Sequence, residues 1–271
     1  MGNNTVLGIV CSPNTDGRTN KLVQAALDGA AEAGARTEIV QMSEHVVDAC
    51  KDCIPWVCNT NRKCTYEDEA FDYLSEKILN CGALVLGTPV YWSDTSGMIG
   101  YLALKMQRIH GFAAPLKGLP AAGIAIAGGT GNGLCTGLRP VYHFFQTMHM
   151  RALKPYPSTK FNFDAALQAY SQIGADLAGM ADQRCAFSSN DERLTWYDSL
   201  PYLNLSRTEE RRLLGTIVSA SLGEDANPEI ARGLVKADAL LAGDRKLDAL
   251  LEITRVYEAG SKAWAKTQVP V

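Results

Sequence analysis

The chain has 271 residues, of which 46% are hydrophobic and 20% charged, and its formal net charge is −3 at pH 7. This composition is ordinary for a globular protein that buries a sizeable core. The small negative charge excludes the basic surface that nucleic-acid phosphates require, so we expect no nucleic-acid partner.

The amino-terminal segment carries none of the usual targeting patterns. MGNNTVLGIVCS lacks a basic region followed by an apolar region and a cleavage site, and Val6 stands where a myristoylation motif needs Ser or Thr. Apolar stretches such as GLPAAGIAIAGG are far shorter than the roughly 20 residues of a membrane helix. We therefore expect a cytoplasmic protein with no membrane partner, in a compartment where clustered cysteines indicate metal or redox chemistry more often than disulfides.

Strand and helix patterns alternate along the first two thirds of the chain. Apolar runs predict strands at residues 5–12, 36–43, 82–92, 119–129 and 151–161, and helical spacing predicts helices at 20–34, 68–81, 96–112, 133–150 and 164–183. Pro140 is expected to bend the fourth helix or trim its start. This alternation predicts an α/β fold, a doubly wound five-stranded parallel sheet with helices on both faces. Ligands of such sheets bind beyond the carboxyl ends of the strands.

The character of the sequence changes from about residue 185. Residues 185–214 show no strand alternation, and residues 228–266 are typical of two helices separated near Gly243. We predict a sheet domain at 1–184 and a C-terminal helical extension at 185–271. A helix with an apolar stripe must bury it, against its own domain or against a neighbouring subunit. The residues of this stripe are Leu240, Leu241, Leu247, Leu250, Leu251, Ile253 and Val256.

Three polar or glycine-rich loops follow the first, third and fourth predicted strands. The first combines hydroxyls, amides and glycine directly before a helix, which favours an anion site, although an N-capped helix after a polar turn explains it equally well. The second offers two aromatic residues that suit a flat ring, or that belong to the core. The third lets the backbone approach a ligand closely, or is a flexible turn. The candidate ligand-binding residues are Ser12, Asn14, Gly17, Arg18, Thr19 and Asn20, then Pro89, Val90, Tyr91, Trp92 and Ser93, then Gly128, Gly129, Thr130, Gly131 and Gly133.

The segments SPNTDGRTNKL, GTPVYWSDTSG and AGGTGNG together resemble the NAD(P)H-dependent FMN reductase family, which has a flavodoxin-like fold. The resemblance covers roughly residues 5 to 184. It implies that FMN is the cofactor, with its phosphate at the first loop and its isoalloxazine ring flanked by the other two. It also implies NAD(P)H as electron donor and a homodimer or homotetramer. The family often has Arg after the Pro of the first loop, where this chain has Asn14 and, further on, Arg18.

Four cysteines, Cys50, Cys53, Cys58 and Cys64, lie within fifteen residues with the spacing C-x2-C-x4-C-x5-C. Four thiolates on one loop hold a cubane iron–sulfur cluster or a zinc ion, and free thiols are the third reading. The position of the motif is similar to that in the iron–sulfur flavoproteins, a branch of the same family, although the middle gap is longer by two residues. The resemblance thus implies a [4Fe-4S] cluster. Cys11, Cys81 and Cys135 stand in apolar settings and are expected to be buried packing residues.

No Ser-His-Asp set or paired carboxylates are apparent, and flavin chemistry needs none because the cofactor carries the reaction. We expect an FMN-dependent oxidoreductase that passes electrons from NAD(P)H, directly or through the cluster, to a small-molecule or protein acceptor. The alternatives are a cluster-free quinone, flavin or azo reductase and a non-catalytic flavodoxin-like binding or scaffold protein.

Overall fold

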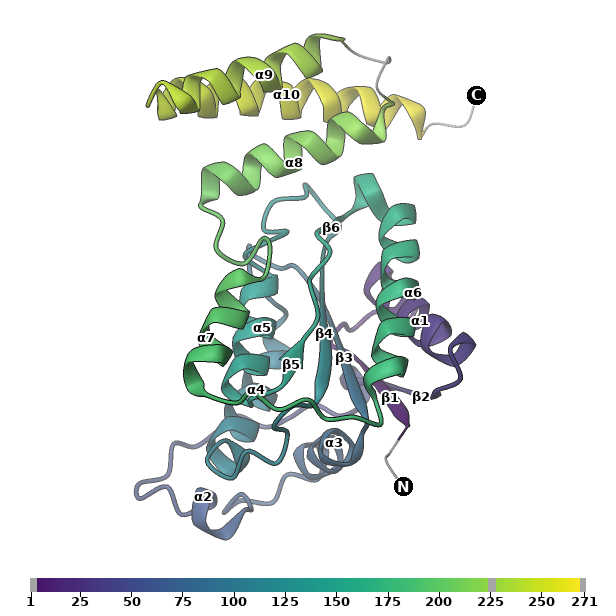
Figure 1. Ribbon diagram of the computed structural model, residues 1–271, viewed down its shortest axis with the longest axis vertical. Helices are drawn as coiled ribbons and strands as arrows, with labels where there is room; N and C mark the ends of the chain where they lie inside the picture. Colours follow the sequence, from purple (N-terminus) through teal and green to yellow (C-terminus); the bar gives the residue numbers. More distant parts are fainter. Residues whose placement is uncertain (1–3, 224–227, 269–271) are drawn as a thin grey trace.

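The structure is a computed structural model that describes residues 4–223 and 228–268. Its centre is a parallel sheet with strand order β2-β1-β3-β4-β5, the flavodoxin-like arrangement. The predicted fold class is therefore confirmed (Figure 1). The strands are β1 (Thr5–Val10), β2 (Arg36–Gln41), β3 (Ala83–Pro89), β4 (Pro120–Ala127), β5 (Arg151–Ala152) and β6 (Ser158–Thr159).

The fifth predicted strand, residues 151–161, is interrupted. Its two ends form β5 and β6, which pair with the beginning and the end of β4 respectively. Between them lie Pro155 and Pro157, and proline has no N–H to donate to a strand ladder. The segment thus acts as one edge strand with an unpaired middle.

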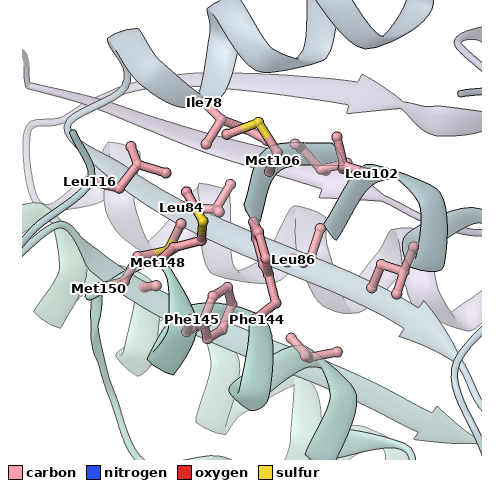
Figure 2. Packing of buried hydrophobic residues seen from close by; sticks show 14 of the residues in the cluster. Ile78, Leu84, Leu86, Leu102, Met106, Leu116, Phe144, Phe145, Met148 and Met150 are labelled. Atoms are coloured by element: carbon pink, nitrogen blue, oxygen red, sulfur yellow. The ribbon is translucent and has the colours of Figure 1, made fainter. Parts of the chain in front are cut away.

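Helices cover both faces of the sheet. Helices α1 (Arg18–Glu32) and α6 (Phe163–Met180) pack on one face, and α3 (Glu69–Asn80), α4 (Gly97–His110) and α5 (Leu138–Thr147) on the other. Figure 2 shows the second layer: Leu84 and Leu86 of β3 lie among side chains of α3, α4 and α5. Alternate residues of β3 belong to the two clusters, as the two-residue period of a strand buried on both faces requires.

Helix α5 starts later than the pattern at 133–150 suggested. Residues 133–137 form turns, and Pro140 falls in the first turn of α5, where a backbone N–H has no partner inside the helix. Trimming of the start, one of the two predicted effects of Pro140, is what the structure shows.

The segment directly after residue 184 belongs to the core of the sheet domain. Helix α7 (Asn190–Ser199) packs beside α5, and its Tyr197 hydroxyl donates a hydrogen bond to the Met150 carbonyl at 2.8 Å. Leu200 and Leu203, which follow α7, are buried in the same cluster as β3 and α4. The sequence pattern gave no sign of α7 or of α8 (Arg207–Ser221), whereas the two later helices were predicted correctly as α9 (Pro228–Ala242) and α10 (Lys246–Thr267).

Helices α8, α9 and α10 form a layer beyond the end of the sheet near β6, as Figure 1 shows. Leu214 and Val218 of α8 are buried with Ala127 at the end of β4, and Trp264 of α10 packs edge-to-face on Phe161 at 5.0 Å between ring centroids. The extension thus packs on its own domain at the carboxyl edge of the strands. Along the predicted stripe, Ile253 and Val256 are buried, Leu240, Leu241 and Leu250 are half-buried, and Leu247 and Leu251 are exposed.

Three short helices complete the description: η1 (Met42–Glu44), α2 (Cys58–Asn61) and η2 (Lys160–Asn162). Within the described residues, no helix is both long and apolar enough to cross a membrane.

Candidate functional site

The three loops singled out from the sequence meet at the carboxyl edge of β1, β3 and β4, which are neighbours in the sheet. Ser96, at the end of the second loop, donates a hydrogen bond to the carbonyl of Cys11, at the start of the first loop, at 2.6 Å. Gly133 of the third loop packs so tightly on Ser93 of the second that an added Cβ would stand 2.8 Å from the Ser93 Cα. The fold therefore gathers the predicted ligand-binding residues in one place.

The first loop presents an uncapped helix start. The N-cap of α1 is Gly17, no side chain caps the helix, and its first turn holds no acidic residue. Asp68, Ser189 and Ser206, in contrast, cap α3, α7 and α8 with their side chains. The reading of this loop as an ordinary N-capped helix therefore fails, and the first N–H groups of α1 are left for an anion.

The side chains of the loop support this arrangement. Ser12 and Thr19 are buried, with 4% and 3% of their surface exposed. Ser12 Oγ accepts a hydrogen bond from the Asn14 N–H at 3.2 Å, and Asn14 Oδ1 accepts one from the Asp16 N–H at 3.0 Å, so these two side chains shape the loop itself. Arg18 lies over the ring of Phe163 at 5.9 Å and beside Gly128 of the third loop. The Arg18 guanidinium therefore lies between the first loop (residues 12–20) and the third loop (residues 128–133), which we call the glycine loop.

The second loop is a tight turn. Tyr91 and Asp94 exchange two backbone hydrogen bonds of 2.9 Å, and the two residues between them, Trp92 and Ser93, have φ angles of 54° and 60°. Positive φ at both central positions is the type I′ geometry, which normally selects Asn and Gly. The side chain of Trp92 is completely exposed. The reading of these aromatic residues as core residues therefore fails, and a strained turn holds a flat side chain in the open.

The third loop contains two kinds of glycine. Gly128 and Gly129 are open, and nothing lies within 4 Å of a Cβ built on Gly129. Gly131 and Gly133 have φ angles of 85° and 86°, and a Cβ on Gly131 would stand 2.6 Å from Leu214. The first pair thus leaves room for a ligand, whereas the second pair is required by the backbone conformation and by packing against the protein.

The extension contacts this edge through residues that the sequence did not reveal. Glu210 of α8, with 6% of its surface exposed, accepts hydrogen bonds from the backbone N–H groups of Cys135 at 2.8 Å and Thr136 at 3.3 Å. The Tyr257 hydroxyl of α10 donates one to the Thr130 carbonyl at 2.7 Å. The pattern S-x-x-E at Ser206 marks a helix start, but nothing in it indicates contact with a loop more than 70 residues earlier.

The four clustered cysteines lie elsewhere. All four are half-buried and line a single cavity together with Lys105 and Arg108 of α4. Since α4 begins after the tight turn and runs about 1.5 Å per residue, this cavity lies roughly 15–20 Å from the three loops at the carboxyl edge. Figure 1 shows α2, which carries Cys58, at the end of the molecule opposite to α8, α9 and α10.

Charged side chains hold the walls of this cavity. Arg108 donates a hydrogen bond to the Cys50 sulfur at 3.3 Å and pairs with Asp52 at 2.7 Å. Asp68 pairs with buried Lys105 and accepts hydrogen bonds from the N–H groups of Phe71 and Asp48. Burial by itself raises the pKa of Asp68, but the Lys105 hydrogen bond and the two N–H groups outweigh it, so the pKa lies below its ordinary value. Asp68 thus fixes the start of the cysteine loop to α3 and α4.

The spacing of the sulfurs bears on which metal group fits. In the described parts of the chain, no three His, Cys, Asp or Glu side chains stand close enough to hold a single metal ion. A zinc ion needs its sulfurs within about 4 Å of one another, because each Zn–S bond is about 2.3 Å. In a cubane, each thiolate binds a different corner, so the thiolates stand farther apart. In this structure the four cysteines line one cavity, but no three of them stand at the spacing that a single ion requires.

The remaining cysteines were predicted to be packing residues, and Cys11, Cys81 and Cys135 are indeed buried. Burial raises the pKa of the Cys81 and Cys135 thiols to about 12, so both remain protonated at neutral pH. Cys185 is exposed.

The fold is that of a flavodoxin-like protein, and the three loops lie at the edge of the sheet where such proteins bind their ligands. The sequence pattern of the NADPH-dependent FMN reductase family matches residues 4–162. The chain belongs to this family, and it is an NAD(P)H-dependent reductase of the flavoprotein class.

Two relatives are similar in sequence to about half of this chain, and one solved structure is similar in fold. An iron–sulfur flavoprotein of Methanocaldococcus jannaschii is 28% identical over 141 residues, which cover 52% of this chain and 70% of the relative. An iron–sulfur flavoprotein of Methanosarcina thermophila is 27% identical over 128 residues, which cover 47% of this chain and 65% of the relative. The solved structure of RosB with a bound 8-demethyl-8-formylriboflavin-5'-phosphate superposes with a TM-score of 0.52 at 17% identity, covering 70% of this chain and 84% of RosB. That superposition shows the fold.

Proposed function

We propose that the protein binds FMN with the phosphate at the start of α1 and the isoalloxazine ring between the tight turn at 91–94 and the open glycines 128–129. The observation that carries this proposal is the uncapped N-terminus of α1, set at the same edge as the two other loops. Unpaired N–H groups and the positive end of the helix dipole stabilise a phosphate there. FMN held there would supply hydride chemistry between NAD(P)H and an acceptor, while the loops named above would bind and orient it.

The phosphate assignment is tested by removing single hydroxyl groups. Thr19→Ala and Ser12→Ala each remove a hydrogen bond to a charged group, worth about 1.5–3 kcal/mol, so the dissociation constant of FMN should rise at least tenfold. Thr37→Ala on the exposed part of β2 is the matched control and should leave FMN affinity unchanged. An unchanged constant in both loop variants would place the phosphate elsewhere.

The proposal includes a [4Fe-4S] cluster held by Cys50, Cys53, Cys58 and Cys64. Three observations support it: the four sulfurs share one cavity, Arg108 donates a hydrogen bond to one of them, and the curated relatives are iron–sulfur flavoproteins. N–H···S hydrogen bonds of this kind are among the factors that set cluster potentials. A resident cluster would supply single-electron transfer beside the two-electron chemistry of a flavin.

Iron and acid-labile sulfide, measured on protein purified without oxygen, test the cluster. We expect about four of each per chain, as a cubane requires. Cys58→Ser should lower both, whereas Cys185→Ser, an exposed cysteine outside the cavity, should not. Zinc alone would indicate a structural site. The absence of iron, sulfide and zinc would leave the second candidate function, a cluster-free quinone, flavin or azo reductase.

We further propose a homodimer or homotetramer acting on a small-molecule or protein acceptor. Val235, Leu247 and Leu251 of α9 and α10 are exposed at 69%, 70% and 62% and favour burial in an assembly. Light scattering tests this: the wild-type mass should be a multiple of the 29.3 kDa chain, and Leu247→Glu with Leu251→Glu should lower it. A monomeric wild type would refute the assembly.

A further inference from the structure

A cleft separate from the cysteine cavity lies between the glycine loop and helix α8 of the extension. It has a volume of about 550 Å³ and is bounded by the tight turn (Trp92, Ser93), the glycine loop (Asn132, Gly133) and the first turns of α8. Ligand pockets commonly measure 300–1,000 Å³, so the cleft is large enough for part of a nucleotide. The family pattern ends at residue 162, so the α8 wall of this cleft lies outside the matched region.

Two arginines of α8, Arg207 and Arg211, line this cleft one helical turn apart. In the part of the chain that the structure describes, neither guanidinium has an ion-pair or hydrogen-bond partner. The next arginine, Arg212, differs, because both its Nε and its Nη2 bind Asp238 of α9. The arginines of the cleft are therefore available to an incoming anion, and guanidinium groups bind phosphates with paired hydrogen bonds.

A further cationic cavity at this edge lies beside the proposed FMN phosphate site and is less suited to the phosphates of a second ligand. It contains Arg18 and Lys160, but Arg18 lies over the Phe163 ring and Lys160 lies over the rings of Phe161 and Trp264, at 5.1 and 5.4 Å. Those cations already interact with aromatic faces. The cleft with Arg207 and Arg211 thus has the cations that are free to pair.

One carboxylate shares the cleft. Glu210 lies between the two arginines in sequence, but its Oε1 accepts hydrogen bonds from the N–H groups of Cys135 and Thr136. Two guanidinium groups and one engaged carboxylate leave a net positive charge. The wholly exposed indole of Trp92 adds a flat surface at the mouth of the cleft, on which an aromatic base can stack.

We infer that this cleft binds the phosphate-bearing part of the pyridine nucleotide, with Arg207 and Arg211 as the groups that contact its anionic oxygens. The inference rests on the proposed function, since a nicotinamide that reaches a flavin between the two loops carries its diphosphate only a few bonds away. The cleft begins at Trp92 and Ser93 of the same tight turn and ends at the arginines. Uncharged acceptors such as quinones have no group that needs two cations.

Equilibrium binding to the FMN-loaded, full-length protein tests this inference. The variants are Arg207→Gln, Arg211→Gln and the double variant, and Arg212→Gln is the control that removes the same charge from the same helix. Each oxidised holoenzyme is titrated with NADP⁺ and with NAD⁺ through the flavin absorbance. Each cleft variant should raise the dissociation constant about tenfold and the double variant more, while the control changes it less than twofold. FMN content should stay at the wild-type level.

The pattern of losses identifies the phosphate. If the affinities for NAD⁺ and NADP⁺ fall equally, the arginines contact the diphosphate. If the affinity for NADP⁺ falls more, they contact the 2′-phosphate. Both results support the inference. Unchanged nucleotide affinity in the double variant overturns it, including the case in which only the KM of an anionic acceptor rises. A wild-type protein that binds no FMN, or whose FMN is not reduced by NADPH, refutes the proposed function instead and the inference with it.

Discussion

Removal of the Glu210 carboxylate should loosen the contact between the extension and the glycine loop. This carboxylate accepts three hydrogen bonds from Cys135 and Thr136, at 2.8, 3.3 and 3.4 Å. In Glu210→Ala, the buried Cys135 N–H loses its partner, which costs about 1–3 kcal/mol, while half-buried Thr136 regains part of its bonding from water. We expect the free energy of unfolding to fall by about 2–3 kcal/mol.

Thermal and urea unfolding measure this loss. At about 2–4 °C per kcal/mol for chains of this size, the melting temperature should fall by roughly 4–12 °C. Glu210→Gln keeps an acceptor oxygen but not the charge, so its loss should be smaller, near 1 kcal/mol. Glu258→Ala, which makes the same change at an exposed position of α10, is the control and should be nearly neutral.

The same variant connects stability to cofactor binding. Because Thr136 and Cys135 follow the glycine loop directly, loss of Glu210 should also weaken FMN binding. If Glu210→Ala unfolds at the same temperature and urea concentration as the wild type, the hydrogen bonds of Glu210 do not stabilise the protein.

Two further predictions concern the scaffold. Gly174→Ala should destabilise the protein by about 3 kcal/mol in urea unfolding, because its Cβ would stand 1.7 Å from the Ala26 carbonyl oxygen of α1. Gly179→Ala on the same helix meets nothing within 4 Å and should be neutral or slightly stabilising, so equal effects would contradict the packing. Asp68→Ala should cost about 3–5 kcal/mol at pH 7, since it leaves Lys105 buried without its partner. Because the pKa of Asp68 is lowered, its contribution to the free energy of unfolding is fully present above the ordinary value of 3.8 and is lost as the pH falls through the lowered value. The difference in unfolding free energy between the wild type and Asp68→Ala should therefore shrink in acid, and a constant difference would argue against this.

The sequence was informative wherever a local pattern determines structure. The apolar runs of β1, β3 and β4 are buried on both faces and were recognisable from composition. Loops that follow such strands meet at one edge by topology, so the candidate residues from Ser12 to Gly133 could be grouped before any coordinates were known. The fifth strand was predicted as continuous over residues 151–161, and its division was missed although the effect of Pro155 and Pro157 on the ladder is local.

Long-range contacts were not accessible in this way. Glu210 contacts Cys135 and Leu214 contacts Gly131, each from more than 70 residues away, and the sequence of α8 has no feature that identifies these partners. The loop glycines illustrate the same limit. Glycine-rich sequence predicted close approach to a ligand, but Gly131 and Gly133 approach Leu214 and Ser93 of the protein itself. Sequence indicates that a backbone must be approached closely, and the structure identifies what approaches it.

The cleft proposed for the nucleotide would give the reductase a means of selecting its substrate that lies outside the region matched by the family pattern. Residues 4–162 contain all three loops of the proposed FMN site: residues 12–20, the tight turn at 91–94 and the glycine loop at 128–133. The wall opposite the tight turn comes from α8, and α8 is itself held to the domain by Glu210, by Leu214 against Gly131, and by the aromatic contact between Trp264 and Phe161. In the two proposals, the residues that would contact the flavin and the arginines that would contact the nucleotide therefore come from different segments of the chain, and Glu210 connects the two. A change at Arg207 or Arg211, which leaves these anchors intact, should alter nucleotide affinity and leave the loops of the proposed FMN site in place.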